Sequence, residues 1–416
     1  MTTKTVAGAS KTQHFIDLEN KYGAHNYHPL PIVIAKAKGV WVTDPDGRKY
    51  MDCLAAYSAL NQGYNHPRIM AAAREQLKTG VTLTSRAFYN TKLGEFLEKV
   101  CKITGHDRAL PMNTGAEAVE TAIKLARRWG YRVKKVRKGQ AQIIAFNGNF
   151  HGRTTTIVGF SSAEDYKEGF GPFTPGFKMV DYGDIAALEK AITKSTVAIL
   201  IEPIQAEGGI LIPPKGYLKK VAALCKKHNI LLIADEIQTG LGRTGKMFAM
   251  DHEGVKPDVY LLAKAISGGF MPVSVVTANN DVMRVFDPGS HGSTFGGNPL
   301  GAAVAVEALN ILLDDKLPQR AAELGEYFVR GLKAIKSRHV KSIRARGLLI
   351  GVEIRRESGD ARPFCEKLME KGILAKETHE SVIRFAPPLV ITKEEIDWAL
   401  KRIAAVLTDE APVERN

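Results

Sequence analysis

Short, continuous apolar runs recur through the middle of the chain, each bounded by polar or glycine-rich sequence. Strands that are buried on both faces of a parallel sheet have this pattern. The runs occupy residues 142–146, 196–202, 230–234, 259–263 and 273–278. An amphipathic, helix-like segment at residues 217–228 lies between two of them. The order of strand, helix and strand predicts an α/β domain with a mostly parallel sheet.

The hydrophobic pattern differs toward both ends of the chain. Residues 40–53 alternate around the turn DPDG, which predicts a β-hairpin. From about residue 300 long helical patterns appear, followed by apolar runs at residues 348–354, 373–375 and 382–385 and a final helix. We therefore expect three parts, which are an N-terminal arm and hairpin (1–57), a large domain (58–303) and a smaller C-terminal α+β domain (304–416).

Asp235 and Lys264 follow directly on two of the central apolar runs. In open parallel sheets, ligands bind at the carboxyl ends of the strands. A carboxylate and an amine delivered there suit pyridoxal phosphate, because an aspartate keeps the ring nitrogen of this cofactor protonated while a lysine bonds its aldehyde. The pairing predicts a pyridoxal-phosphate site.

Other residues could complete such a site. Thr114 and Glu117 form an S/T-x-x-E capping box, and the small Gly115 and Ala116 leave helix N-terminal N–H groups accessible to a phosphate. The loop at residues 147–153 carries Phe150, His151 and Arg153, of which the first could stack on a ring and the last could hold a carboxylate. A core phenylalanine and a surface ion pair are the alternatives for this loop taken alone.

The segment GLGRTGK at residues 240–246 satisfies G-x-G-x-x-G and nearly matches a nucleotide-binding phosphate loop. Met247 stands where that loop needs a hydroxyl, and the following residues start a helix poorly. We interpret it as a glycine-rich turn that lets backbone pass close to the cofactor.

Composition and charge narrow the function classes. The 58 Lys and Arg residues exceed the 44 Asp and Glu residues by a formal charge of +14, but the basic clusters lie on helix-like segments with interleaved apolar positions. This distribution favours solvated helix faces over a nucleic-acid partner. No run of 18 apolar residues and no signal-peptide core occurs, so we expect a cytoplasmic protein without a membrane partner. The four cysteines are scattered, and we expect neither a disulfide framework nor a metal site.

With these residues assembled, the sequence resembles the class III, or subgroup II, aminotransferases of fold type I over nearly its whole length. The resemblance rests on NTGAEAVETAIKLAR, FHGR, EPIQ, LLIADEIQTGLGRTG, LLAKAISGG, GSHGSTFGGNP and RFAPPL. It implies a large domain with a mostly parallel seven-stranded sheet, a smaller α+β domain, and a homodimer with active sites at the interface.

Carried over residue by residue, the resemblance makes Lys264 the lysine that bonds the cofactor and later moves a proton, and Asp235 the partner of the pyridine nitrogen. Thr294 would contact the cofactor phosphate of the second subunit. The other implied cofactor contacts are Gly115, Ala116, Phe150, His151 and Gln238.

The segments YGAHNYHPLP and AAYSALNQG favour family members that use L-ornithine as amino donor and 2-oxoglutarate as acceptor, giving glutamate 5-semialdehyde, which cyclises to pyrroline-5-carboxylate, and glutamate. In them Tyr27 and Arg153 would hold the α-carboxylate of ornithine, and Tyr57 would line the same pocket. Glu207 would neutralise Arg384 with ornithine bound and release it with 2-oxoglutarate.

Two positions depart from the family pattern: Ala206 replaces an expected glycine, and His151 replaces a bulkier aromatic. Donors such as N-acetylornithine, 4-aminobutyrate or lysine, and a racemase of the same fold, are the alternatives.

Overall fold

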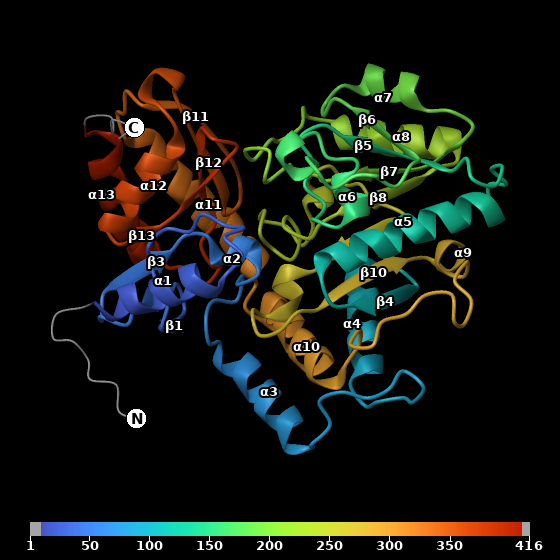
Figure 1. The fold of residues 1–416 in the computed structure, drawn as a ribbon, viewed down its shortest axis with the longest axis horizontal. Helices are drawn as coiled ribbons and strands as arrows, with labels where there is room; N and C mark the ends of the chain where they lie inside the picture. The colour runs from blue at the N-terminus through green and yellow to red at the C-terminus, as the bar shows by residue number, and fades with distance from the viewer. Residues whose placement is uncertain (1–9, 410–416) are drawn as a thin grey trace.

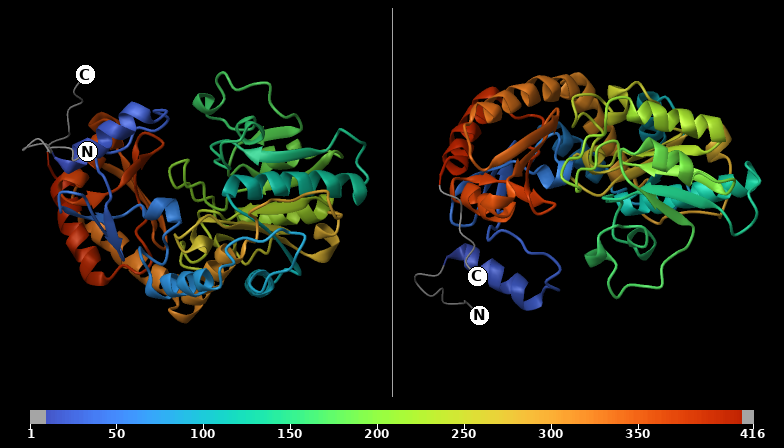
Figure 2. Two further views of the ribbon diagram at one scale, coloured as in Figure 1. Left: turned by 60° about the horizontal axis from the view of Figure 1, so that its bottom comes forward. Right: turned by 90° about the horizontal axis from the view of Figure 1, so that it is seen from above.

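The computed structural model describes residues 10–409, which form two bodies (Figures 1 and 2). The larger body is built on a seven-stranded sheet within these residues. β10 runs antiparallel to β4 and β9, and the remaining pairings are parallel. The strands, in spatial order, are β4 (Arg108–Met112), β10 (Ser274–Ala278), β9 (Val259–Leu262), β8 (Leu231–Asp235), β7 (Thr196–Ile201), β5 (Gln142–Phe146) and β6 (Phe177–Val180).

Helices cover both faces of this sheet, which explains why its strands are continuously apolar. In β5, Ile143 and Ala145 belong to one buried cluster and Ile144 and Phe146 to another, because successive side chains point to opposite faces. The long helix α5 packs on the first face, and α4, α8 and α10 lie on the other side. The helices of this body are α3 (Pro67–Lys78), α4 (Leu93–Thr104), α5 (Gly115–Arg132), α6 (Thr155–Val158), α7 (Ile185–Ala191), α8 (Tyr217–His228), α9 (Asn280–Met283) and α10 (Pro299–Asp314), with short 3-10 turns η1 (Glu164–Tyr166), η2 (Ala249–His252) and η3 (Lys264–Ser267).

The smaller body combines both ends of the chain (Figure 1). One of its sheets has the order β1-β2-β3-β13 and the other β11-β12-β15-β14. The N-terminal hairpin strand β3 pairs in parallel with β13 from the C-terminal region. The strands are β1 (Lys36–Lys38), β2 (Trp41–Thr43), β3 (Lys49–Asp52), β11 (Val340–Arg346), β12 (Leu349–Ile354), β13 (Ile373–Leu374), β14 (Lys376–Thr378) and β15 (Val382–Phe385), and the helical elements are α1 (Lys11–Tyr22), α2 (Ala55–Ser58), α11 (Leu317–Ala334), η4 (Arg356–Ser358), α12 (Ala361–Glu370) and α13 (Lys393–Leu407).

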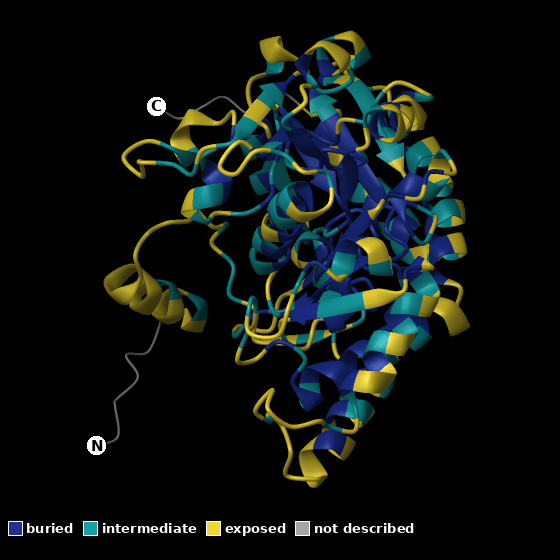
Figure 3. Ribbon diagram, turned by 90° about the vertical axis from the view of Figure 1, so that its right-hand side faces the viewer, coloured by how far each residue is buried: buried dark blue, intermediate teal, exposed yellow. Residues whose placement is uncertain are grey.

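The sequence prediction of the fold is confirmed for the central sheet, the hairpin and both capping boxes. Helix α1 and strands β1, β4, β6, β11 and β14 were not predicted from the hydrophobic pattern. Helix α1 has no buried residue and stands apart from the body in Figure 3. The domain boundaries after residues 57 and 303 stay a prediction. Within residues 10–409, no helix is both long enough and apolar enough to cross a membrane.

The glycine-rich segment at residues 240–246 forms a turn but lies elsewhere than predicted. A side chain at Gly245 would meet Ala322 of α11, and one at Gly242 would meet Pro318. Arg243 is fully buried and donates hydrogen bonds to the carbonyl groups of Leu348 and Pro387. The turn therefore joins the two bodies, and the prediction that it passes beside the cofactor is wrong.

Candidate active site

A cavity of about 590 Å³ lies where the carboxyl ends of β5, β7, β8 and β9 meet the N-terminus of α5. Its volume is within the usual range for cofactor sites. Many residues singled out from the sequence line it: Gly115, Ala116, Phe150, His151, Asp235, Gln238 and Lys264. The sheet topology thus brings together side chains that are far apart in the sequence.

Lys264 follows the end of β9 and has a left-handed backbone, with φ of 47°. This conformation costs free energy for a residue other than glycine. Such strain is common where a side chain must be directed at a ligand. Burial lowers the pKa of its amine, against the opposing influence of the Glu207 carboxylate. A lowered pKa makes the neutral, nucleophilic amine easier to form.

Asp235 ends β8, and one of its oxygens lies 2.7 Å from Nδ1 of His151. The contact joins a carboxylate oxygen to a ring nitrogen at hydrogen-bond distance. The other oxygen accepts from the backbone N–H of Ile237 at 3.1 Å. These two bonds fix the orientation of the carboxylate toward the cavity.

The N-terminus of α5 is fixed by the predicted capping box. The Thr114 hydroxyl accepts from the Glu117 N–H at 3.2 Å, and the Glu117 carboxylate accepts from the Thr114 N–H at 2.7 Å. Gly115 and Ala116 line the cavity at this helix end, where an anion is favoured. An amine, a carboxylate and an anion-favouring helix end around one cavity fit pyridoxal phosphate.

Next to the cavity, three side chains from the two bodies form one polar cluster. Arg384 on β15 donates to Glu207 at 2.6 Å and to the side-chain oxygen of Gln238 at 3.2 Å. The side-chain NH₂ of Gln238 donates to the same Glu207 oxygen at 3.1 Å. Burial raises the pKa of Glu207, but the charge of Arg384 and these hydrogen bonds outweigh it, and the pKa is lowered. The predicted pairing of Glu207 and Arg384 is present.

Tyr57 stands on an unusual turn at the edge of this cluster. The residues of α2, Ala55–Ser58, all have φ between 46° and 75°, a left-handed conformation that costs roughly 1–2 kcal/mol per non-glycine residue. Asp52 stabilises the start of the turn by accepting from the N–H groups of Leu54 and Ala55. The turn places the Tyr57 ring 4.9 Å from the Arg384 guanidinium carbon, so the ring covers the buried cation.

Besides Tyr57, Glu207 and Arg384, which lie next to the cavity, three more predicted site residues lie outside its lining. Arg153 is exposed, with its guanidinium carbon 3.5 Å from the centre of the Tyr166 ring. Tyr27 is 76% exposed, although it is close enough to Tyr57 to contribute to the raised pKa of that phenol, which burial mainly causes. Thr294 lies in an exposed loop. Their roles stay predictions.

Glu202 is a cavity residue that the sequence analysis gave no role. It follows β7 just as Asp235 ends β8, so the same pattern could have identified it. Burial, together with the negative charge of Asp235, raises its pKa well above the usual range. Its carboxyl group accepts from the Phe150 N–H at 2.9 Å and so holds the loop that carries Phe150 and His151.

We expect the Glu202→Gln variant to fold. Its stability relative to that of the unsubstituted protein should increase as pH rises. In the unfolded chain this carboxyl releases its proton at about pH 4.3, whereas in the folded protein the raised pKa keeps the proton bound. The protein with Glu202 therefore loses stability as pH rises from the unfolded pKa toward the folded pKa. Glutamine keeps the acceptor and does not titrate. Denaturant unfolding at about pH 5 and about pH 8 measures the difference. Identical pH dependence of the two proteins would contradict a protonated Glu202.

The fold and the site together define a pyridoxal-phosphate enzyme, with a lysine and an aspartate at strand ends and a phosphate-type helix end around one cavity. Comparisons with known proteins agree with this class. The family model for class III aminotransferases matches residues 22–407. The chain therefore belongs to the class III aminotransferases, which use pyridoxal phosphate.

Similar proteins include an ornithine aminotransferase of Brevibacillus brevis. The two sequences are 61% identical, and the alignment covers 96% of this chain and 99% of that protein. The solved ornithine aminotransferase of Toxoplasma gondii ME49 has a TM-score of 0.94 and 47% identity, with 96% of each chain covered. The acetylornithine aminotransferase of Elizabethkingia anophelis has a TM-score of 0.87 and 46% identity, with 96% of this chain and 99% of that chain covered.

Proposed function

We propose that this protein is an ornithine δ-aminotransferase, which transfers the δ-amino group of L-ornithine to 2-oxoglutarate. The observation that carries the proposal is the ion pair between Glu207 and Arg384 beside the cofactor cavity. An enzyme that alternates between a substrate with a cationic end and one with two carboxylates must hide a positive charge and then offer it. Relatives that are about 60% identical over almost their whole length carry the same activity in their names.

The residues of this chain divide the work of the reaction. Pyridoxal phosphate, when bound, supplies an aldehyde that takes up the amino group and a ring that draws electrons from the bonds being broken. Lys264 Nζ would be the base that takes a proton from the δ-carbon of ornithine. Asp235, which His151 orients, would keep the ring nitrogen of the cofactor protonated. Phe150 would stack on the ring, Gln238 would bond its hydroxyl, and Gly115 and Ala116 would hold its phosphate.

The two half-reactions use the polar cluster in different ways. With ornithine bound, Tyr27 and Arg153 hold its α-carboxylate while Glu207 keeps the charge of Arg384 hidden. With 2-oxoglutarate bound, Glu207 releases Arg384, which binds the α-carboxylate while Arg153 binds the distal one. The Tyr57 ring gives Arg384 a second partner during this change. The products are glutamate 5-semialdehyde, which cyclises to pyrroline-5-carboxylate, and glutamate.

A homodimer would complete this site. Thr294 is exposed, and the neighbouring Phe295 is 55% exposed. Phe88 and Tyr89, in the segment before α4, are also largely exposed. Exposed apolar side chains of this kind mark contact surfaces. A second copy would cover them and bring its own Thr294 to the cofactor phosphate.

All four cysteines are free thiols, which supports a reducing compartment, the cytoplasm.

Two additions to the purified protein test the proposed activity. L-ornithine alone should remove the visible absorption band of the lysine-linked cofactor, 2-oxoglutarate should restore it, and pyrroline-5-carboxylate should appear as product. Stronger bleaching by N-acetylornithine or 4-aminobutyrate would leave the aminotransferase chemistry in place and contradict the assignment of ornithine. Turnover of an amino acid without a keto-acid acceptor would indicate a racemase.

A further inference from the structure

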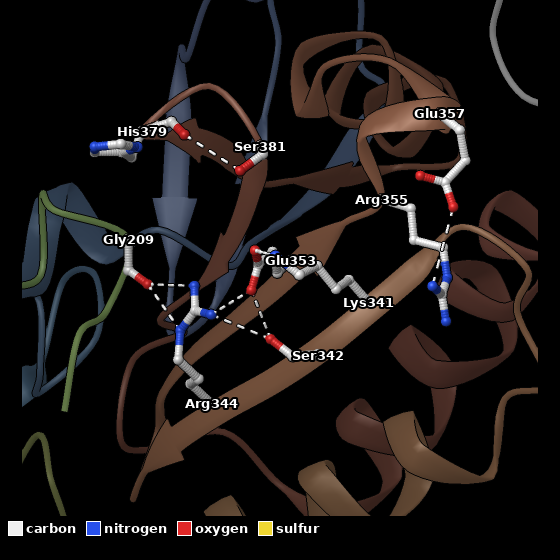
Figure 4. Close-up of polar contacts among 9 residues, drawn as sticks. All are labelled: Gly209, Lys341, Ser342, Arg344, Glu353, Arg355, Glu357, His379 and Ser381. Carbon is white, nitrogen blue, oxygen red and sulfur yellow. Dashed lines mark hydrogen bonds and ion pairs between the residues drawn. The ribbon is translucent and has the colours of Figure 1, made fainter. Parts of the chain in front are cut away.

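The loop that carries Glu207 lies over one face of the small-body sheet, and a second arginine of that sheet contacts the loop backbone. Arg344 on β11 donates to the carbonyl oxygen of Gly209 through Nε at 3.2 Å and through Nη2 at 2.9 Å (Figure 4). Two bonds from one guanidinium to one carbonyl fix both the position and the direction of the backbone there.

Arg344 and Arg384 stand in one row across this sheet. Arg344 pairs with Gly351 of β12, and Gly351 pairs with Arg384 of β15. Directly opposed residues of antiparallel strands project from the same face. Gly351 leaves a notch between the two arginines, because a side chain there would come within 3.1 Å of Val382 and 3.2 Å of Ile210.

The loop contacts all three positions of this row. Its Glu207 side chain binds Arg384, its Ile210 side chain occupies the notch at Gly351, and its Gly209 carbonyl binds Arg344. The Thr378 hydroxyl adds a fourth attachment by donating to the Glu207 carbonyl at 2.7 Å. The Glu207 side chain can therefore leave Arg384 while its backbone stays attached to the same sheet.

The charge of Arg344 is satisfied independently of the cavity. Its Nη1 binds Glu353, which also accepts from Ser342 at 2.7 Å and Lys341 at 2.8 Å (Figure 4). These partners, Lys341 first, lower the pKa of Glu353 to about 2, so its charge persists across the physiological range. Arg344 thus has no unpaired charge with which to compete for Glu207 or for a substrate carboxylate.

We propose that Arg344 is a positioning residue that anchors the Glu207 loop, so that Glu207 returns to Arg384 each time ornithine replaces 2-oxoglutarate. The inference rests on the proposed function for its effect on substrates, but the anchoring itself does not. Without Arg344 the loop loses its fixed end, Glu207 covers Arg384 less completely, and ornithine meets an exposed positive charge. Glutamate, whose α-carboxylate needs Arg384 free, is affected much less.

The test compares Arg344→Ala with Arg355→Ala, a nearby arginine whose partner is the exposed Glu357 rather than the loop (Figure 4). Single-turnover bleaching of the cofactor band gives kcat/KM for L-ornithine and for L-glutamate. Loss of charged hydrogen bonds predicts a fall of about tenfold for ornithine in Arg344→Ala and less than about threefold for glutamate. Glu207→Gln should shift the ratio in the same direction, and Arg355→Ala should leave it unchanged.

A second readout does not depend on substrate. The amides of Gln205, Ile210 and Leu211 donate to carbonyl groups within the loop. In deuterium exchange of the holoenzyme, we expect these amides to exchange slowly. Their exchange should rise about tenfold in Arg344→Ala and stay unchanged in Arg355→Ala. Gly351→Ala, which fills the notch under Ile210, should also raise the exchange of these loop amides. This variant replaces Arg344→Ala in the test if Arg344→Ala fails to fold.

Each outcome supports or overturns the proposal. Equal losses for both donors, or unchanged exchange in the loop, would show that Arg344 supports the sheet only. If Glu207→Gln shifts the ratio of kcat/KM for the two donors and Arg344→Ala does not, the switching role of Glu207 is supported and the anchoring role of Arg344 is wrong. If the native enzyme does not accept ornithine, the proposed function fails, and the exchange experiment still decides whether Arg344 holds the loop.

Discussion

Replacing Lys264 with alanine is expected to reduce ornithine turnover on the order of 10⁴-fold, because the variant loses both the covalent link to the cofactor and the group that moves the proton. The protein should remain folded. The midpoint of its thermal unfolding should be unchanged or higher. The substitution removes a buried amine whose charged form is disfavoured by burial. Coupled detection of pyrroline-5-carboxylate measures turnover, and the visible spectrum measures the loss of the lysine-linked cofactor.

Lys246→Ala is the matched control for this experiment. Lys246 belongs to the GLGRTGK segment, is exposed, and donates to the backbone carbonyl of Asp251. Its removal should leave turnover within about twofold, as for most surface substitutions. An equal loss in both variants would contradict the assignment of Lys264, and a loss in Lys246→Ala alone would reopen the nucleotide interpretation of that segment.

Replacing Arg384 with alanine is expected to separate the two half-reactions. The half-reaction with 2-oxoglutarate should slow about 100-fold, because the α-carboxylate loses a charged, fork-shaped donor. The half-reaction with ornithine should slow less than about tenfold: without Arg384, the pKa of the buried Glu207 rises and its carboxyl becomes neutral more easily. Rapid-mixing spectra of each half-reaction provide the measurement.

Arg346→Ala controls for removing an arginine from the same sheet. Arg346 is an exposed residue of β11, and its loss should change neither half-reaction by more than about twofold. Equal slowing of both half-reactions in Arg384→Ala would mean that Arg384 stabilises the site without distinguishing substrates, and the switching role would be wrong.

The sequence was most informative where local pattern and chemistry coincide. Asp235 and Lys264 could be placed in one site because both follow continuous apolar runs, and the carboxyl ends of parallel strands meet at one edge of a sheet. The capping box of Thr114 and Glu117 fixed the start of α5 for a similar reason, since its interactions span only four residues.

Features that depend on long-range contacts could not be predicted in this way. Arg344 lies on a strand whose pattern gave no clear period, and its partner Gly209 is 135 residues away in the sequence. The left-handed turn around Tyr57 is formed by alanine, tyrosine and serine, none of which favours that conformation locally. Glu202 is different, because the pattern that identified Asp235 applied equally to it.

The parallel pairing of β3 with β13 affects how the protein folds during synthesis. β3 is made early, but the strand beside it is translated only after most of the chain has been made. Because translation adds roughly 5–20 residues per second, one edge of the N-terminal hairpin stays unpaired for tens of seconds while the rest of the chain is made. The larger body can close during this interval, whereas the smaller body can be completed only near the end of translation. An unpaired strand edge is a template for association with other chains, so the nascent hairpin is where we expect chaperones to be needed most.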